Sequence, residues 1–369
     1  GIDIVITDHH ECKDTLPEAY AVVDPCREDC PYPFKELAGV GVVFKLINAL
    51  CIKMNLGNKH MEYLDLVALG TVADVVSLTD ENRIIVKYGT DLIQNTKNIG
   101  LKTLINVSGL MERQIDSWSI GFGIAPRINA AGRLGDASRA VKLFVTKSSE
   151  EALSIALELN EDNRLRQDMD LSIYNDALKI IEEEIDLNRQ KVIVVAKEGW
   201  HHGIVGIVAS KLVERFYRPC ILISIDDGVG KGSGRSIEGF NIFEALGHCD
   251  DLLLKYGGHE LAAGLTISPE NINAFRSRIN EYADEVLTRN DLIPKIRADA
   301  RIQKSDISLE SVRQLEALSP FGPGNQPPLF VYDNLTIVEQ RVVGKDKNHL
   351  RLKLDDNGFQ IDAIGFNMG

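Results

Sequence analysis

Apolar positions in the first part of the chain alternate between the spacing of strands and the spacing of helices. Residues 2–7 form a short apolar run typical of a buried strand, and residues 21–24 form a second one. Apolar positions recur at helical spacing over residues 40–54 and 63–76. Strands that alternate with helices are typical of a parallel sheet, so we expect residues 1–147 to form an α/β domain.

A long helix and a second α/β domain are expected next. Ser148 and Glu151 have the spacing of a capping box, and an amphipathic pattern continues to about residue 185. We therefore expect a connecting helix over residues 148–187 with a solvated charged face. Residues 188–290 then repeat the α/β alternation. Strands are expected at 191–196, 220–225 and 261–267, a glycine-rich extended stretch at 230–236, and helices at 204–216 and 243–255.

The last segment, residues 291–369, changes to a pattern of antiparallel strands. Residues 335–343, 349–355 and 359–366 alternate apolar and polar positions, and Asp356-Asn357-Gly358 is typical of a tight hairpin. The pattern predicts an OB-like β-barrel, in whole or in part, and such barrels commonly bind single-stranded nucleic acid. The candidate DNA contacts, against the alternative of ordinary hairpin solvation, are Lys345, Lys347 and Arg351.

Composition narrows the class of protein. With 26% charged and 44% hydrophobic residues, the 369-residue chain is globular and long enough for two or three domains. It has no apolar run of 18 residues and no signal-peptide pattern, so we expect no membrane association. Six scattered cysteines fit a reducing cytoplasm, and Cys12, Cys26 and Cys30 lack a fourth ligand at zinc-finger spacing. The net charge of −13 confines any nucleic-acid site to a local basic groove.

Candidate chemistry begins at Asp8-His9-His10, directly after the first expected strand. Open α/β sheets place their ligand sites at the carboxyl ends of strands. On a straight strand the two histidines would face opposite ways, but on the turn that follows both can reach one site. A carboxylate with two imidazoles suits Mn²⁺, Fe²⁺ or Zn²⁺. The tripeptide alone fits equally well a capping aspartate followed by two solvated histidines.

A second candidate is Asp74, which lies in an otherwise apolar, helix-like run over residues 68–76. A carboxylate buried in such a run needs a cation, and a metal ion is the cation we favour. The alternative is a residue at a helix end, beside the polar loop of residues 79–82.

Further clusters have the chemistry of phosphate binding. Arg127 and Arg133 bracket Asn129 and several small residues, so a nucleic-acid chain can approach while guanidinium groups reach phosphate oxygens. His201 and His202 precede a helix whose N-terminal N–H groups form an anion site. The remaining candidates are Gly234, Arg235, Ser236, Gly257, Gly258 and His259. Each cluster alone is also typical of an ordinary turn or helix start, but metal and phosphate candidates together imply phosphoester hydrolysis.

Together these motifs resemble those of the DHH phosphoesterase superfamily, and the family of RecJ single-strand-specific DNA exonucleases most closely. Asp8-His9-His10 is similar to the motif that names the superfamily, and Gly70-Thr71-Val72-Ala73-Asp74 to its next aspartate motif. The segment from Arg127 to Arg133 resembles the RecJ arginine motif. The segments Gly234-Arg235-Ser236 and Gly257-Gly258-His259 resemble the companion DHHA1 domain, and the strand-rich tail resembles the RecJ OB domain.

The resemblance implies a role for each part of the chain. Residues 1–147 would be the C-terminal portion of a DHH domain, 188–290 the DHHA1 domain and 291–369 the OB-like domain. His9 and Asp74 would bind metal, while His10 would contact the scissile phosphate. Asp8 would orient the histidines. The arginines, His201, His202 and the glycine-rich segments would hold the DNA strand or its 5′ end.

The activity that the resemblance implies is 5′→3′ removal of nucleotides from single-stranded DNA during repair and recombination. It would be carried out by a cytoplasmic monomer with two Mn²⁺ or Mg²⁺ ions.

Two features depart from the family. An Asp-x-Asp motif and a further aspartate motif precede Asp-His-His in the family, and this chain has neither. The chain also begins without Met at the edge of a strand and ends directly after another strand pattern, which predicts a fragment of a longer protein. A two-metal site would then lack ligands, so we expect this chain to be a weak or inactive nuclease.

Three other functions stay open. A superfamily enzyme could act on very short RNA, cyclic dinucleotides or pyrophosphate, although such enzymes generally lack the strand-rich tail. A non-catalytic scaffold for single-stranded DNA would not need intact Asp8, His9, His10 and Asp74. A protein that binds another phosphorylated ligand would require the ordered motifs to be coincidental.

Overall fold

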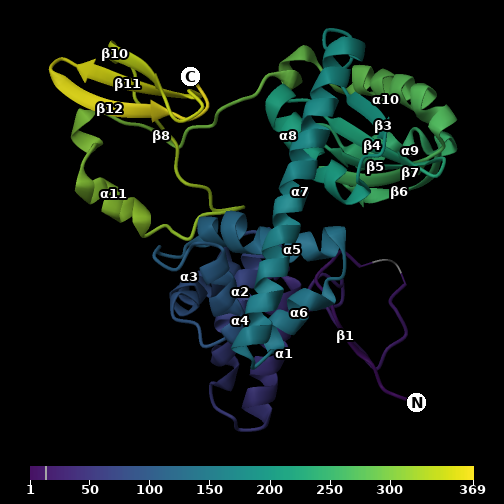
Figure 1. Ribbon diagram of the computed structural model, residues 1–369, viewed down its shortest axis with the longest axis vertical. Coiled ribbons are helices and arrows are strands. Elements are labelled where there is room, and N and C mark those ends of the chain that lie inside the picture. The colour runs from purple at the N-terminus through teal and green to yellow at the C-terminus, as the bar shows by residue number, and fades with distance from the viewer. Residues whose placement is uncertain (13–14) are drawn as a thin grey trace. The chain divides into compact units, whose positions relative to one another are not determined.

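The computed structural model describes residues 1–12 and 15–369 (Figure 1). These residues divide into two compact units. The first unit contains residues 1–90, 116–118 and 296–369, and the second contains residues 91–115 and 119–295. Within the described part of the chain, no helix is both long and apolar enough to cross a membrane.

A parallel pair of short strands and a group of helices open the first unit. Strand β1 (Val5–Thr7) pairs with β2 (Ala21–Val23), with Val5 opposite Ala21. Strand β1 is shorter than the apolar run that predicted it, since Ile2 and Ile4 lie before the paired residues and are exposed. The helices are α1 (Gly39–Lys53), η1 (Lys59–Tyr63), α2 (Leu64–Ala73) and α3 (Asp80–Gln94), the last of which continues into the second unit.

Helices make up the first part of the second unit. Ser148 caps the long helix α7 by accepting a hydrogen bond from Glu151 N at 3.2 Å. The Glu151 carboxylate does not accept the reciprocal hydrogen bond from Ser148 N, because it accepts a hydrogen bond from Thr146 Oγ1 and pairs with Lys142 instead. Only one of the two hydrogen bonds of the capping box is therefore present. The helices are α4 (Ile99–Val107), the π-helix η2 (Ser119–Ile124), α5 (Ala125–Leu134), α6 (Ser138–Val145) and α7 (Ser149–Glu184).

The second unit also contains a five-stranded sheet with helices on both faces (Figure 1). Its order is β3-β4-β5-β7-β6, in which β3 and β4 are parallel and the other neighbours antiparallel. Alternate side chains face opposite cores, so Leu222 packs with α7 and α8 while Ile221 packs with α9 and α10.

The strands of this sheet are β3 (Ile193–Glu198), β4 (Cys220–Asp226), β5 (Val229–Arg235), β6 (Leu253–His259) and β7 (Ala262–Ile267). The helices are α8 (His202–Phe216), α9 (Ile242–Gly247), η3 (Asp250–Leu252), η4 (Pro269–Asn271), α10 (Ile272–Val286) and η5 (Arg289–Leu292).

One expected helix is wrong. Residues 243–255 divide among the short helix α9, the 3-10 turn η3 and the start of strand β6. Asn241 caps α9 as a helix start should be capped, but the apolar residues 252–254 fit a strand as well as a helix. Pairing with β7, from Leu253 opposite Ile267 to His259 opposite Ala262, decides for the strand.

The C-terminal residues of the first unit contain the expected OB-like strands. Strands β10 (Thr336–Val343), β11 (His349–Asp356) and β12 (Phe359–Gly365) form an antiparallel meander. Asn357 and Gly358 have φ angles of 49° and 90°, as the tight hairpin requires. In the described residues this sheet is open, with β10 and β12 as its edges. The remaining elements are β8 (Ala300–Arg301), η6 (Lys304–Asp306), α11 (Leu309–Glu316) and β9 (Phe330–Val331).

Asn280 of α10 joins this helix to the sheet, and its replacement tests the fold. The buried side chain accepts from Val192 N and donates to Val192 O, both at 3.0 Å. Asn280→Ala leaves both backbone groups unpaired, so we expect the free energy of unfolding to fall by about 2–4 kcal/mol in urea denaturation. Asn273→Ala, at an exposed position of the same helix, should change it by less than about 0.5 kcal/mol. Equal effects of the two substitutions would contradict this role.

Candidate metal and phosphate sites

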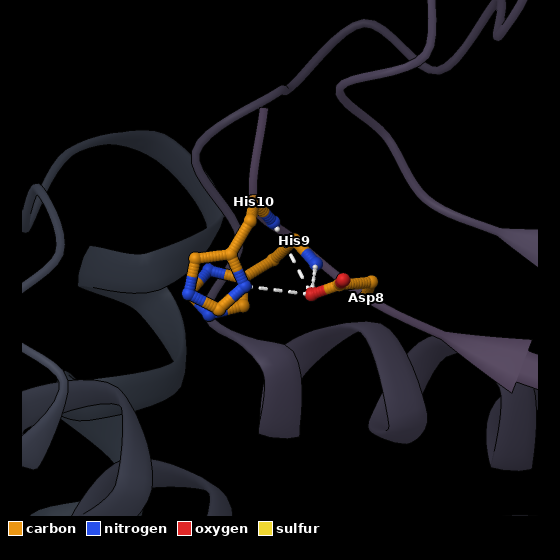
Figure 2. Close-up of side chains that lie close together, drawn as sticks. All are labelled: Asp8, His9 and His10. Carbon is orange, nitrogen blue, oxygen red and sulfur yellow. Dashed lines mark hydrogen bonds and ion pairs between the residues drawn. The ribbon is translucent and has the colours of Figure 1, made fainter. Parts of the chain in front are cut away.

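Asp8, His9 and His10 form a tight turn at the carboxyl end of β1 (Figure 2). Asp8 N donates to Val23 O at 3.1 Å, which holds the turn on β2. Asp8 Oδ1 accepts hydrogen bonds from His9 N at 2.8 Å, His10 N at 3.3 Å and His10 Nδ1 at 2.8 Å. These bonds bring the two rings together, with centroids 4.3 Å apart. Both histidines can therefore reach one site, as the turn predicted.

Asp74 meets this turn from the end of α2. His9 Nε2 and Asp74 Oδ2 are 3.3 Å apart. The expectation that Asp74 is buried is wrong: its side chain is 42% exposed, because α2 ends at Ala73 and Asp74 is the C-cap. The position is thus the helix end that was the alternative, and the carboxylate nonetheless lies against His9.

The donor atoms at this site fit a divalent ion. Adjacent ligands about 2.1 Å from an octahedral ion lie about 3 Å from each other, close to the spacing of His9 Nε2 and Asp74 Oδ2. An imidazole with a carboxylate suits a divalent metal ion such as Mn²⁺, Fe²⁺ or Zn²⁺. Asp8 already accepts three N–H groups through Oδ1, which suits it to orient the histidines. His10 uses Nδ1 toward Asp8, so its Nε2 is the atom that can face another group.

The contact between Asp8 and His10 shifts the pKa values of both side chains. The hydrogen bond from His10, helped by His9 N, lowers the pKa of the Asp8 carboxyl. The same hydrogen bond raises the pKa of the His10 imidazole. The ion pair between Asp8 and His10 stabilises the turn most at pH values between the ordinary pKa of an aspartate and that of a histidine. This contribution is lost as the pH rises through the raised pKa of His10, or falls through the lowered pKa of Asp8.

Gly39, the first residue of α1, also lies at this site and was not expected from the sequence. A Cβ atom at this position would lie 3.2 Å from His9 Cδ2, so glycine allows the helix to approach the ring closely. The sequence signal was weak, because a glycine at the start of an apolar helix has many possible reasons. Cys26 adds a second missed contact, its thiol donating to His9 O at 3.3 Å.

In the second unit, the arginines of α5 have different surroundings. Arg127 is half-buried and binds α7 and η2, with Nε donating to Asn160 Oδ1 at 2.9 Å and Nη1 to Gly123 O. Burial lowers the pKa of Arg127. Arg133 is exposed and its Nη1 donates to Gly203 O, on the first turn of α8, at 2.9 Å. Asn129 is exposed on the same helix. Arg133 therefore lies at the helix N-terminus, while Arg127 holds helices together.

Alternation along β5 decides which of its side chains face α8. A Cβ atom at Gly206 of α8 would lie 3.3 Å from both Ser233 Oγ and Arg235 Nη2. Gly234 faces the opposite core, where a Cβ atom would lie 2.5 Å from Ile242 Cδ1. Gly234 thus permits close packing. Because side chains alternate along a strand, Ser233 faces the same way as Arg235, although it was not among the expected site residues.

Ser236 and the two histidines before α8 have local partners. Ser236 Oγ donates to Phe240 O at 2.6 Å. His201 Nδ1 accepts from Gly203 N at 3.1 Å and so caps α8, while burial lowers the pKa of His201. His202 is exposed and stacks on His201, with ring centroids 5.2 Å apart. Of the pair, His202 has the freer access to solvent.

The expected turn at Gly257-Gly258-His259 is wrong, because these residues belong to strand β6. They pair with Gly264, Ala263 and Ala262 of β7. Gly258 has a φ of 149°, and a Cβ atom there would lie 2.4 Å from Ala262 O, so the close approach of the strands requires glycine. The chain reverses at residues 260–261, just beyond.

The basic residues of the OB-like strands differ in surroundings. Lys345 and Lys347 are exposed on the hairpin between β10 and β11. Arg351 Nη2 pairs with Asp362 Oδ1 on β12 at 3.2 Å, which offsets part of its charge. The two lysines are therefore better placed to meet a polyanion.

The features of both units match those of known protein domains. Residues 1–71 match the DHH family N-terminal domain, 189–285 the DHHA1 domain and 298–369 the RecJ OB domain. An Asp-His-His turn after a parallel strand, combined with a DHHA1 domain, defines a protein of the DHH class of phosphoesterases.

Relatives that align over the whole chain identify the family. The chain is 45% identical over 372 residues to the single-stranded-DNA-specific exonuclease RecJ of Bacillus subtilis, covering 100% of this chain and 46% of that relative. It is 36% identical over 389 residues to RecJ of Salmonella typhimurium, covering 100% of this chain and 67% of that relative. The chain therefore belongs to the RecJ family of single-stranded-DNA-specific exonucleases, and it spans about half the length of the B. subtilis relative.

Solved structures agree with this assignment. The crystal structure of RecJ from Thermus thermophilus in complex with Mn²⁺ superposes with a TM-score of 0.85 at 32% identity, covering 98% of this chain and 52% of that chain. A structure of the same protein with Mg²⁺ has a TM-score of 0.82 at 31% identity, covering 99% and 59%.

The contact between Asp8 and His10 can be tested by titration of the metal-free protein. Asp8→Asn removes the carboxylate that raises the pKa of His10, so this pKa should fall toward its ordinary value. Nuclear magnetic resonance of the imidazole protons measures it directly. Asp29→Asn, which removes the carboxylate paired with Arg27, should leave the pKa of His10 unchanged. An unchanged pKa of His10 in Asp8→Asn would show that Asp8 does not hold this ring.

Proposed function

We propose that this chain serves in metal-dependent 5′→3′ hydrolysis of single-stranded DNA. The observation that carries the proposal is the arrangement at the end of β1. There His9 Nε2 and Asp74 Oδ2 lie 3.3 Å apart, next to a His10 ring that Asp8 orients. A ligand pair beside an imidazole available to a phosphate is the donor set that phosphodiester hydrolysis needs. Membership of the RecJ family supports single-stranded DNA as the substrate.

The residues of this turn suit a Mn²⁺ or Mg²⁺ ion, as found in the Thermus thermophilus structures. We infer that His9 and Asp74 hold it. When bound, such an ion lowers the pKa of a water molecule and polarises the phosphate. Asp8 keeps His10 in place through Nδ1, which leaves Nε2 as the ring atom that can contact a phosphate group.

The second unit supports attack from the 5′ end. Arg133 contacts Gly203 on the first turn of α8, and Ser233 and Arg235 face Gly206, about one turn further along the same helix. A terminal phosphate monoester carries a charge of about −2, whereas an internal phosphodiester carries one negative charge. Two guanidinium groups near the start of a helix favour the more highly charged end of the strand. Lys345 and Lys347 are the candidates in the OB-like strands for contact with the backbone.

We expect the isolated chain to be a weak nuclease. Among the described residues, Asp8, His9 and His10 form the one close group of three or more possible metal ligands, and Asp74 adds a carboxylate to it. Two hexacoordinate ions need about ten or more ligands, and Asp8 and His10 already bind each other. These donors support one ion better than two.

A digestion assay tests this expectation. With Mn²⁺ and a 5′-labelled single strand, we expect the pure chain to release nucleotides only slightly faster than His9→Ala. A dinucleotide substrate is run in parallel. Rapid digestion of the long strand would overturn the expectation of weak activity, and rapid turnover of the dinucleotide alone would favour a small-substrate phosphoesterase.

Binding of DNA tests the phosphate site separately from catalysis. We expect the chain to prefer a 5′-phosphorylated single strand over a 5′-hydroxyl strand and over a duplex in fluorescence anisotropy. Arg235→Ala should weaken binding of the phosphorylated strand about tenfold or more, because it removes charge-assisted hydrogen bonds. Arg189→Ala, which removes an arginine that is 87% exposed, is the matched control. Equal binding of all three DNAs would contradict a 5′-end site.

A further inference from the structure

Val75 opens the turn of residues 75–79, directly after Asp74, and has a backbone conformation that valine rarely adopts. Its φ angle is 60°, in the left-handed region where a β-branched side chain is strained. It follows the C-cap of α2, and its N–H donates to Val72 O at 3.2 Å, a helix end that glycine usually forms. The Val75 side chain is 69% exposed, so its own apolar packing contributes little to holding this conformation. Such strain persists only where the surrounding structure enforces it, so other contacts must restrain the turn.

Asn82 of α3 restrains this turn from one side. The side chain is fully buried, and its Nδ2 atom donates to Ser77 O at 3.0 Å and to Glu36 O at 2.5 Å. Ser77 lies three residues after Asp74, and Glu36 lies three residues before Gly39, the glycine that packs against the first imidazole of the site. One buried amide therefore connects the backbone that follows one candidate metal ligand to the backbone that supports the other.

The segment of residues 317–325 restrains the turn from another side. Leu78 N donates to Pro323 O at 2.7 Å. Gly324 has a φ of 71°, and a Cβ atom there would overlap Ser77 Oγ, so this close approach requires glycine. The segment lies within the residues that match the RecJ OB domain, so a part of the chain far from Asp74 in sequence fixes the turn that follows it.

Arg83 of α3 holds this segment in place. Its Nη2 atom donates to three successive backbone oxygens, each at 3.2 Å, those of Ala317, Leu318 and Ser319. Arg83 and Asn82 are adjacent on α3, so this helix restrains the turn both directly and through the segment of residues 317–325.

We propose that Asn82 and Arg83 are positioning residues of the candidate metal site, because they hold the strained turn at Val75 and so keep Asp74 directed toward His9. The proposal rests on the proposed function, since it concerns the ion that His9 and Asp74 would share. If Val75 returns to an ordinary φ, its hydrogen bond at the end of α2 is lost. The last turn of the helix can then unwind, and the exposed carboxylate of its C-cap, Asp74, is no longer held 3.3 Å from His9 Nε2.

The test is the dissociation constant for Mn²⁺, measured by electron paramagnetic resonance of the free hydrated ion during titration of the chain. The number of sites and the constant are fitted separately, so an unfolded fraction lowers only the number. We expect Asn82→Ala to weaken binding about tenfold, since a valine disfavours the left-handed turn by about that factor once the restraint is removed.

Arg83→Gln should weaken Mn²⁺ binding severalfold. It removes a positive charge, which by itself would favour a cation, so weaker binding would not be an effect of charge. Lys87→Gln removes an exposed cation one turn further along α3 and is the matched control, which should not weaken binding.

Val75→Gly separates positioning from a merely structural role. Glycine adopts a φ of 60° without strain, so the turn then depends less on its restraints. The loss of affinity that Asn82→Ala causes should therefore shrink to about twofold in a Val75→Gly background, and the loss that Arg83→Gln causes should shrink likewise. Glycine adds no contact, so a merely structural role of Asn82 and Arg83 predicts equal losses in both backgrounds.

His9→Ala separates failure of this proposal from failure of the proposed function. If the wild-type chain binds no Mn²⁺, or if His9→Ala binds it as tightly as the wild type, both are overturned. If His9→Ala loses binding while Asn82→Ala and Arg83→Gln keep wild-type affinity, or lose it equally with Val75 and with glycine, this proposal alone is overturned. If Asn82→Ala does not fold, the two Arg83→Gln variants decide.

Discussion

The contact between His9 and Asp74 joins two segments that lie far apart in the sequence, and the candidate metal site depends on it. His9 is on the turn after β1, and Asp74 is the C-cap of α2. The Asp8 carboxylate accepts hydrogen bonds from the N–H groups of the turn and from His10 Nδ1. His9 Nε2 makes no bond to Asp8 and faces Asp74 instead. Gly39 allows α1 to approach the His9 ring without displacing it.

The second unit depends on a different constraint, the period of two along β5. Ser233 and Arg235 face Gly206 of α8, while Gly234 permits close packing on the opposite core. The same alternation that builds two apolar cores therefore places polar side chains against one helix. Arg133 contacts Gly203 of this helix from α5, so residues from three separate elements lie along the first two turns of α8.

Local signals predicted much of the fold, and contacts between distant residues decided the rest. The Ser148 cap and the Asn357–Gly358 hairpin depend on neighbouring residues, and both were predicted. Residues 253–255, at the start of strand β6, were predicted as helix, since their pairing with β7 is not visible in their own sequence. The motif around Asp8 was likewise evident, but the exposure of Asp74 depended on where α2 ends. Residues whose importance comes from spatial contacts alone, namely Gly39 and Ser233, could not be found from the sequence.

We propose that the turn after β1 and the end of α2 form one metal site. Anomalous diffraction from crystals of this chain soaked in Mn²⁺ tests it directly. We expect an anomalous peak within bonding distance of both His9 Nε2 and an Asp74 carboxylate oxygen, and its loss in Asp74→Asn. A peak bonded to neither residue, or one that persists unchanged in Asp74→Asn, would show that the two segments do not share a metal ion.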